Sequence, residues 1–312
     1  MKLKRGMAGH KYEGILVVDK ETGPTSHDVV ASMRTILNMR RIGHCGTLDP
    51  LASGILLVCL GAYTRLNEWL SAGEKEYETT FFLGATSDTC DAQGHISARQ
   101  NIDIPGKDEL VRQVQSFAGT IEQVPPAFSA LKVNGVRSYE LARRNLAVPL
   151  RARKVHISCI EVLQYEFPKL LLRVVCSRGT YIRSLAADLG ERLNCGAYVH
   201  TLRRSRVGNL GLDKALELEQ IRELSETGKI VHHFVPPQSA LNDLGQVVLK
   251  PHQLKLFVHG SRVNIKPDLV VWEKKILAVY DPDMHFYGIG QWENQEGDLK
   301  PLKVFRQLVP GF

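Results

Sequence analysis

An isolated carboxylate, Asp49, stands in the stretch GHCGTLDPLASGILLVCLG (43–61), between a glycine-containing loop and a long apolar run. The proline after it disfavours helical backbone at Asp49, which is therefore expected in an extended conformation within a loop. The run that follows, GILLVCL (54–60), has the length and composition of a buried strand. A carboxylate held on such a scaffold suits nucleophilic catalysis, but most Asp-Pro loops use the side chain to cap neighbouring amides. The local pattern leaves both interpretations open.

The elements that must position Asp49 alternate between strands and helices without a regular β-α repeat. Strands are expected at 14–19, 54–60, 75–84 and in the first part of 169–190, where Gly179-Thr180 marks a change from strand to helix. Helices are expected at 25–37, with Thr25 or Ser26 as the N-cap, at 64–70 and at 106–119. This order predicts an α+β fold with a mixed or antiparallel central sheet rather than a doubly wound fold.

Residues 124–154 differ from the rest of the chain in composition. They contain seven Lys or Arg residues against one acidic residue, Glu140, and the pair Asn134-Gly135 predicts a hairpin. Such a run is usually a solvated loop. In a basic protein, with Phe128 and Tyr139 interleaved, the alternative is an arm that grips RNA.

The last quarter of the chain has the pattern of a separate module. Paired prolines in HHFVPPQSALND (232–243) indicate a linker. After it, the short segments VVLK, GSRVNI, ILAVYD and YGIGQW are separated by turns, which predicts a small all-β module. We therefore expect two domains, residues 1–240 and 245–312.

The composition is that of a globular protein of 312 residues, 44% of them apolar and 23% charged, which is long enough for a sizeable core. The net charge of +7 favours a polyanionic partner, because clustered Lys and Arg gain free energy by releasing counterions from phosphates. The alternative is a merely soluble basic surface. Six cysteines without a C-x-x-C pair indicate free thiols in a reducing compartment. The charged start lacks a signal-peptide core and no apolar run approaches a membrane span, so a cytoplasmic protein is expected.

Signatures of several enzyme classes are missing from the sequence. It contains no G-x-x-x-x-G-K-[ST], G-x-G-x-x-G, H-E-x-x-H or G-x-S-x-G motif, and no paired Cys or His at zinc spacing. DTCDAQG (88–94) suggests a calcium loop, but the spacing of Asp88 and Asp91 is wrong and the distal Glu is missing, so a solvated turn is expected. We therefore expect neither a metal nor a cofactor.

Several blocks of the sequence together resemble the TruB family of tRNA pseudouridine synthases. They follow the family's order from about residue 14 to about residue 210, and are VVDKETGPTSHDVV, GHCGTLDPLASGILLVCLGAYTRL, KEYETTFFLG, VPPAFSALKVNGVRSYELAR, SRGTYIRSLAADLG and HTLRRSRVG. One departure is Glu21, where relatives usually have proline. In the C-terminal module, HGSRV, GIGQW and LKPLKVF resemble a PUA domain.

This resemblance implies a pseudouridine synthase fold and an isomerase without a cofactor, which detaches uracil from ribose, rotates it and rejoins it through carbon. Asp49 would be the nucleophile, and Arg183 its partner, expected to lower the pKa of the Asp49 carboxyl group. The other implied site residues contact or support a flipped-out uridine. They are Tyr77, which packs on the uracil and assists proton removal, Tyr181 and Leu202 against the nucleotide, His44 supporting the flipped RNA, Asp91 in the charge network of Arg183, and Lys20, either structural or facing a phosphate.

By resemblance the substrate is uridine 55 in the T arm of tRNA, and the chain acts as a monomer without an obligatory protein partner. Two alternatives retain the fold. One is a non-catalytic RNA-binding or tRNA-folding protein, which would be expected to lack Asp49, Tyr77 or Arg183, and the other is a guide-dependent pseudouridine synthase subunit. A retaining hydrolase using Asp49 would need a second carboxylate at a fixed separation, and no acidic residue adjoins the motif.

Overall fold

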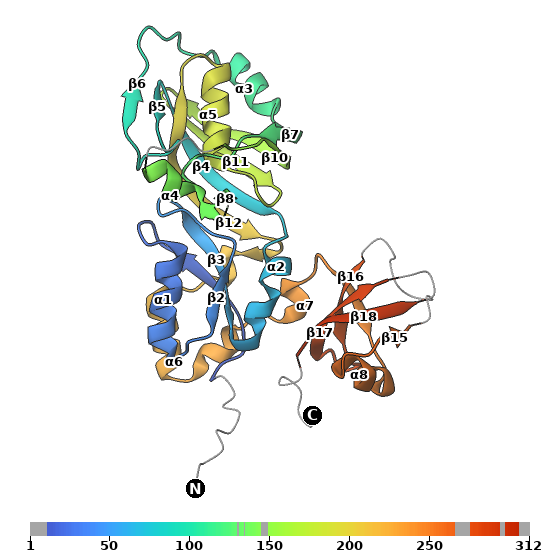
Figure 1. The fold of residues 1–312 in the computed structure, drawn as a ribbon. Coiled ribbons are helices and arrows are strands. Elements are labelled where there is room, and N and C mark those ends of the chain that lie inside the picture. Colours follow the sequence, from blue (N-terminus) through green and yellow to red (C-terminus); the bar gives the residue numbers. More distant parts are fainter. Residues whose placement is uncertain are drawn as a thin grey trace.

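The computed structural model describes residues 11–129, 131–133, 135–144, 149–265, 275–293 and 297–305. Its larger part is built on a nine-stranded sheet, and a smaller C-terminal part on a five-stranded sheet (Figure 1). No helix in the described part of the chain is both long and apolar enough to cross a membrane.

The nine-stranded sheet has the order β1-β3-β12-β4-β11-β10-β7, with β2 paired to β3 and β13 paired to β12. Its neighbouring strands run antiparallel, except that β3 and β12 run parallel. The predicted α+β fold with a mixed sheet is therefore confirmed. The strands are β1 (Gly14–Lys20), β2 (Ile42–Cys45), β3 (Ser53–Leu60), β4 (Lys75–Leu83), β7 (Gly119–Gln123), β10 (Arg153–Glu166), β11 (Lys169–Cys176), β12 (Ala197–Val207) and β13 (Leu210–Gly211).

Four helices share one hydrophobic core with this sheet: α1 (Ser26–Leu37), α3 (Lys107–Gln115), α5 (Ile182–Arg192) and α6 (Leu218–Glu226). Thr25 caps α1, as the sequence predicts, in a reciprocal pair with Asp28. The shorter elements are η1 (Gly61–Leu66), α2 (Asn67–Leu70), β5 (Ala85–Ser87), β6 (Ile96–Ala98), β8 (Lys132–Val133), β9 (Val136–Arg137), α4 (Ser138–Arg143), η2 (Leu212–Lys214), η3 (Lys229–His233) and α7 (Pro237–Ala240), where η marks a 3₁₀ helix.

The parallel contact between β3 and β12 needs a glycine at position 54. Gly54 has φ +96°, and a Cβ atom there would lie 2.2 Å from the carbonyl oxygen of Arg204. The strand that follows the Asp49 loop therefore lies directly against β12, which carries Leu202 and Arg204.

The C-terminal part orders its strands β14-β16-β17-β18-β15 and has a core of its own. Its elements are β14 (Gly245–Val248), α8 (Pro251–Val258), β15 (Val263–Asn264), β16 (Ile276–Tyr280), β17 (Phe286–Trp292) and β18 (Asp298–Val304). The sheet fits the predicted PUA-like module. The strand-and-turn pattern did not predict helix α8, which follows the capping residue Lys250 and begins with a proline.

The segment predicted to be a linker joins the two sheets and is packed against the larger part. The Val235 amide donates to the Ile15 carbonyl on β1 at 2.8 Å, and Leu241 is 1% exposed. A second core joins the two parts, because Tyr63 of η1 packs against Phe286 and Phe305 of the C-terminal module.

Candidate active site

A cleft of about 660 Å³ opens where the Asp49 loop, β4, β12 and the start of α5 meet. The structure brings together five of the predicted site residues, from segments far apart in the sequence, along its wall: Asp49, Tyr77, Tyr181, Arg183 and Leu202. The basic side chains Arg153, Lys154 and Arg178 also line the cleft. The arrangement therefore suits an anionic ligand such as RNA.

The loop that carries Asp49 is held by hydrogen bonds on both sides of the carboxylate. The buried Ser26 hydroxyl donates to the Leu48 carbonyl at 3.0 Å and accepts from the Leu48 amide at 2.8 Å. On the other side, the Gly23 amide donates to the Pro50 carbonyl at 2.8 Å. Asp49 is thus fixed in place without using its own side chain.

Lys20, at the end of β1, supports the same loop and is 1% exposed. Its ammonium group donates to the Glu21 carbonyl at 2.8 Å and approaches the Pro50 carbonyl at 3.5 Å. Burial lowers its pKa, an effect that the nearby Asp49 partly opposes. These contacts contradict the phosphate-facing alternative and favour the structural one. The Glu21 contact uses the backbone, so it does not depend on proline at that position.

The Asp49 carboxylate pairs with Arg183 rather than capping its own loop. Arg183 Nε lies 2.9 Å from Asp49 Oδ2, and no backbone amide donates to this carboxylate in the described part of the chain. The Arg183 side chain is 6% exposed and that of Asp49 37%. Arg183 also donates to the carbonyls of Thr89 at 3.2 Å and Phe128 at 3.0 Å. One guanidinium therefore connects three separate segments of the chain.

Asp91 joins this charge network, as the resemblance implied. Its Oδ2 lies 3.7 Å from Arg183 Nε, and its Oδ1 accepts from the Thr89 hydroxyl at 2.7 Å and the Gln93 amide at 3.0 Å. It is 4% exposed. Asp91 thus brings a second carboxylate to Arg183, but it is buried and already bonded.

The net pKa of Asp49 is raised, although Arg183 itself lowers it, as predicted. Partial loss of solvation in the cleft disfavours the charged carboxylate and outweighs the opposing effect of the Arg183 guanidinium. The nearby Asp91 raises the pKa further. The resemblance indicated that Arg183 would lie near Asp49. It did not indicate how far the folded chain would remove the Asp49 carboxylate from solvent.

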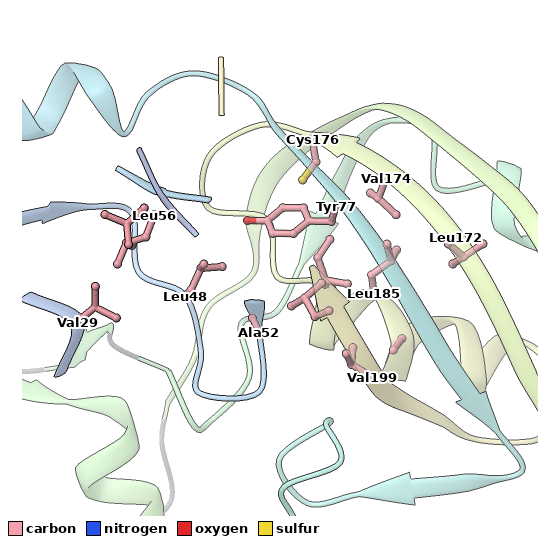
Figure 2. Close-up of a cluster of buried hydrophobic side chains, with 14 of the residues drawn as sticks. Val29, Leu48, Ala52, Leu56, Tyr77, Leu172, Val174, Cys176, Leu185 and Val199 are labelled. Carbon is pink, nitrogen blue, oxygen red and sulfur yellow. The ribbon is translucent and has the colours of Figure 1, made fainter. Parts of the chain in front are cut away.

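Tyr77 lies inside the core that borders the cleft. Figure 2 shows its hydroxyl turned toward Leu48 and Leu56 and away from Val174. Burial raises the pKa of Tyr77, while Arg204 partly offsets that effect. The phenol is therefore protonated at neutral pH, which supports a packing role more than that of a resting base.

His44 is not among the residues that line the cleft. Its ring meets that of His27 edge to face, with centroids 5.2 Å apart, and its buried Nδ1 has no hydrogen-bond partner among the described residues. Burial lowers the pKa of His44 to about 4, so the imidazole is neutral at pH 7. Its support of flipped RNA stays a prediction.

Three residues of the site were missed by reasoning from the sequence. Arg204 is 1% exposed and donates to the carbonyls of Ile55 at 2.7 Å and Gly46 at 3.1 Å, beneath the Asp49 loop.

Lys75 donates to the carbonyls of Ser71 and Gly73, and burial lowers its pKa to about 8. The third, Gln123, binds the backbone of Tyr181. One signal could have indicated that Arg204 points inward: it lies two residues after Leu202, and residues two apart in a strand face the same side of the sheet.

Within the described ranges, the residues placed to hold a metal ion lie outside the cleft. Asp281, Asp283 and His285 bring their ligand atoms within 4.8 Å of one another in the C-terminal module. The Asp281 carboxylate already accepts a hydrogen bond from the His285 amide and lies 3.0 Å from Nδ1 of the His285 ring. At the suspected calcium loop, Asp88 is exposed and accepts from the His95 amide at 2.7 Å, whereas Asp91 is buried, so the predicted solvated turn holds only for Asp88.

Comparison with known proteins identifies the family. Residues 34–182 match the TruB family pseudouridylate synthase (N terminal domain), and residues 183–242 match the tRNA pseudouridylate synthase B C-terminal domain. The chain is similar to tRNA pseudouridine synthase B of Clostridium kluyveri, 36% identical over 294 residues that cover 94% of this chain and 99% of that one. The enzyme of the same name from Syntrophobacter fumaroxidans is 42% identical over 241 residues, 77% of this chain and 79% of that one.

Among solved structures, the chain is similar to one in a Cbf5-Nop10-Gar1 complex, with a TM-score of 0.76 and 29% identity over 95% of this chain and 85% of that one. A chain in an H/ACA RNP bound to a substrate RNA gives a TM-score of 0.73 and 26% identity over 95% of this chain and 85% of that one. The fold, the cleft and the matches across most of the sequence agree. The chain belongs to the TruB family of tRNA pseudouridine synthases, which are isomerases.

Proposed function

We propose that this chain isomerises uridine to pseudouridine at position 55 in the T arm of tRNA, with Asp49 as the nucleophile. The observation that carries this proposal is the ion pair between Asp49 and buried Arg183 in a basic cleft lined by Tyr77 and Tyr181. A partly exposed carboxylate on a fixed loop meets the needs of a nucleophile that must reach one carbon atom while its intermediate is shielded from water.

The target uridine must leave its loop to reach Asp49, because a stacked base does not expose the reacting carbons. Tyr77, Tyr181 and Leu202 supply flat or apolar surfaces for the flipped nucleotide. The reaction breaks the bond between N1 and C1′ and forms one between C5 and C1′, and the hydrogen at C5 leaves as a proton. The Asp49 carboxylate attacks either C6 of the base or C1′ of the ribose.

The substrate is held by basic side chains around the cleft. Arg153 is exposed and belongs to the predicted arm (124–154), whose β8–β9 hairpin is present although Asn134 lies outside the described residues. Arg144 and Arg151, also in the arm, are exposed as well, while the side chain of Arg143 lies outside the described residues. We propose that the arm grips the tRNA and that the C-terminal module provides a second RNA contact.

A guide-dependent subunit is the second candidate, because the similar solved chains come from complexes titled Cbf5-Nop10-Gar1 and H/ACA RNP. Identity favours the first candidate: 36% and 42% to two enzymes named tRNA pseudouridine synthase B, against 29% and 26% to those chains. We therefore propose a monomer that needs no guide RNA or protein partner. A tRNA substrate also agrees with the cytoplasmic location expected from the sequence.

The experiment that tests this proposal incubates the purified chain alone with unmodified tRNA whose uridines carry tritium at C5. Tritium release without any partner is the expected result, and a matched tRNA with cytidine at position 55 is expected to release none above background. Release that requires a guide RNA or a second protein would favour the guide-dependent candidate. Binding without release would favour a non-catalytic RNA-binding protein.

A further inference from the structure

The first turn of α5 carries two residues of the cleft but has no side-chain cap of its own. Tyr181 is the N-cap residue, its side chain makes no capping hydrogen bond, and the first turn contains no acidic residue. Helix starts are normally fixed by Ser, Thr, Asp or Asn at this position. Another part of the molecule must therefore hold the turn that presents Tyr181 and Arg183.

Gln123 supplies that support from the end of β7. It is 1% exposed and lies opposite Arg153 of β10. Its Oε1 accepts from the Tyr181 amide at 2.8 Å, and its Nε2 donates to the Tyr181 carbonyl at 3.1 Å. The same carbonyl accepts from the Leu185 amide at 3.1 Å in the first turn of α5. One buried side-chain amide thus binds both the backbone N–H and the backbone carbonyl of Tyr181, the residue at which the helix starts.

The residues that follow Gln123 bind the same turn. The Ser184 hydroxyl donates to the Val124 carbonyl at 2.7 Å, and Arg183 donates to the Phe128 carbonyl at 3.0 Å. The sheet edge and the base of the arm are therefore attached to α5 next to the guanidinium that pairs with Asp49.

We propose that Gln123 is a positioning residue for the isomerisation: it fixes the first turn of α5 so that Arg183 meets Asp49 and Tyr181 lines the cleft. The inference rests on the proposed function. Reaction rates depend steeply on such placement, since an error of about 1 Å costs about 100-fold. Removing the amide also takes away the partner of the part-buried Tyr181 N–H, which loosens this turn in particular.

The first test is Gln123→Met, which keeps the length of the side chain but loses both hydrogen-bonding groups. The single-turnover rate of tritium release from saturating enzyme is expected to fall about 10- to 100-fold, while the Kd for tRNA changes by less than about threefold. The matched control is Gln220→Met, which removes a similar contact with the Glu217 amide at the start of α6. It is expected to keep the wild-type rate.

The second test is Gln123→Glu, which separates positioning from a general loss of stability. A protonated carboxyl group both donates and accepts, as the amide does, whereas a carboxylate only accepts and repels the Tyr181 carbonyl. Burial raises the pKa of such a group, so its protonated fraction grows as the pH falls from about 8 to about 6. The rate of this variant, divided by the wild-type rate at the same pH, is therefore expected to rise as the pH is lowered from about 8 to about 6.

Two results would overturn the inference: wild-type single-turnover rates in Gln123→Met, or a ratio for Gln123→Glu that does not change with pH. If Gln123→Met does not fold, the pH dependence of Gln123→Glu decides alone. A wild-type chain that releases no tritium would count against the proposed function instead, so the two failures are distinguishable.

Discussion

At the scale of the residue, the chemistry depends on how burial and charge balance at Asp49. Burial raises the pKa of this carboxyl group, and Arg183 opposes that shift without cancelling it. The same guanidinium fixes the carboxylate in space, since it is itself bound to the Thr89 and Phe128 carbonyls. Arg183 therefore both orients the carboxylate and favours its charged form.

The raised pKa of Asp49 predicts an unusually early loss of activity in acid. Only the carboxylate attacks, so activity is complete above the raised pKa and is lost as the pH falls through it. The acidic limb of the single-turnover rate is expected above the ordinary carboxyl pKa of 3.8. Rates measured from pH about 7 downward, with circular dichroism to verify folding, test this. A limb at or below the ordinary value, with the fold intact, would contradict the account.

The sequence predicted which residues line the cleft better than it predicted their hydrogen bonds and pKa shifts. The motifs indicated Asp49, Arg183 and Tyr77, because each belongs to a distinctive block of sequence. The contacts of Gln123 with Tyr181 and of Arg204 with Ile55 join residues 58 and 149 positions apart. Such long-range hydrogen bonds leave no local pattern, and the sign of a pKa shift depends on burial that only the folded chain defines.

At the scale of the element, the site depends on the close approach of β3 to β12. Gly54→Ala is expected to destabilise the protein strongly, because the added Cβ meets the Arg204 carbonyl at 2.2 Å and the backbone has φ +96°. Thermal unfolding of this variant is compared with Gly106→Ala, where a Cβ meets nothing within 4 Å. Equal melting temperatures for the two variants would show that the strands tolerate a wider separation.

The arm (124–154) gives a second prediction at this scale. Replacing the exposed Arg144, Arg151 and Arg153 with Ala is expected to weaken tRNA binding and to lower the slope of log Kd against log salt by about one for each lost phosphate contact. The matched control, Arg222→Ala on α6, removes an exposed arginine outside the arm. An unchanged slope in the triple variant would make the arm a solvated loop.

The elements themselves were predicted where periodicity is strong. Strand β1, helix α1 and strand β4 begin and end within one residue or so of the expected ranges. Strand β2 and helix α8 were missed, because β2 has four residues and α8 lies between turn signals. Strands β10 and β12 were not predicted either, although they have 14 and 11 residues. Such elements depend on the sheet and core that they complete as well as on their own sequence.

At the scale of the whole molecule, the C-terminal module packs directly against the larger part of the protein at η1. Tyr63 packs on Phe286 and Phe305, and Arg65 donates to the Val304 carbonyl at 2.8 Å. Paired prolines in the sequence indicated a linker, but an apolar contact between distant segments cannot be inferred from local composition. These contacts attach the module to the larger part of the protein.

Truncation after residue 240 is consequently expected to destabilise the remaining chain as well as to weaken tRNA binding. It exposes apolar side chains of η1 and α2 that belong to the shared core. Calorimetry and binding of a hydrophobic dye to the truncated and full chains measure the effect. A truncated chain with the melting temperature of the full protein and no added dye binding would show that the two parts are independent.

The most direct test of the account is the single-turnover release of C5 tritium from tRNA by Asp49→Asn. This change is nearly isosteric and removes the nucleophile, while Arg183 retains Asp91 and the two carbonyl contacts. The rate is expected to fall by about 10⁴-fold or more, with the Kd for tRNA little changed. Appreciable turnover by this variant, with its fold and tRNA affinity intact, would contradict the assignment of Asp49 as the nucleophile.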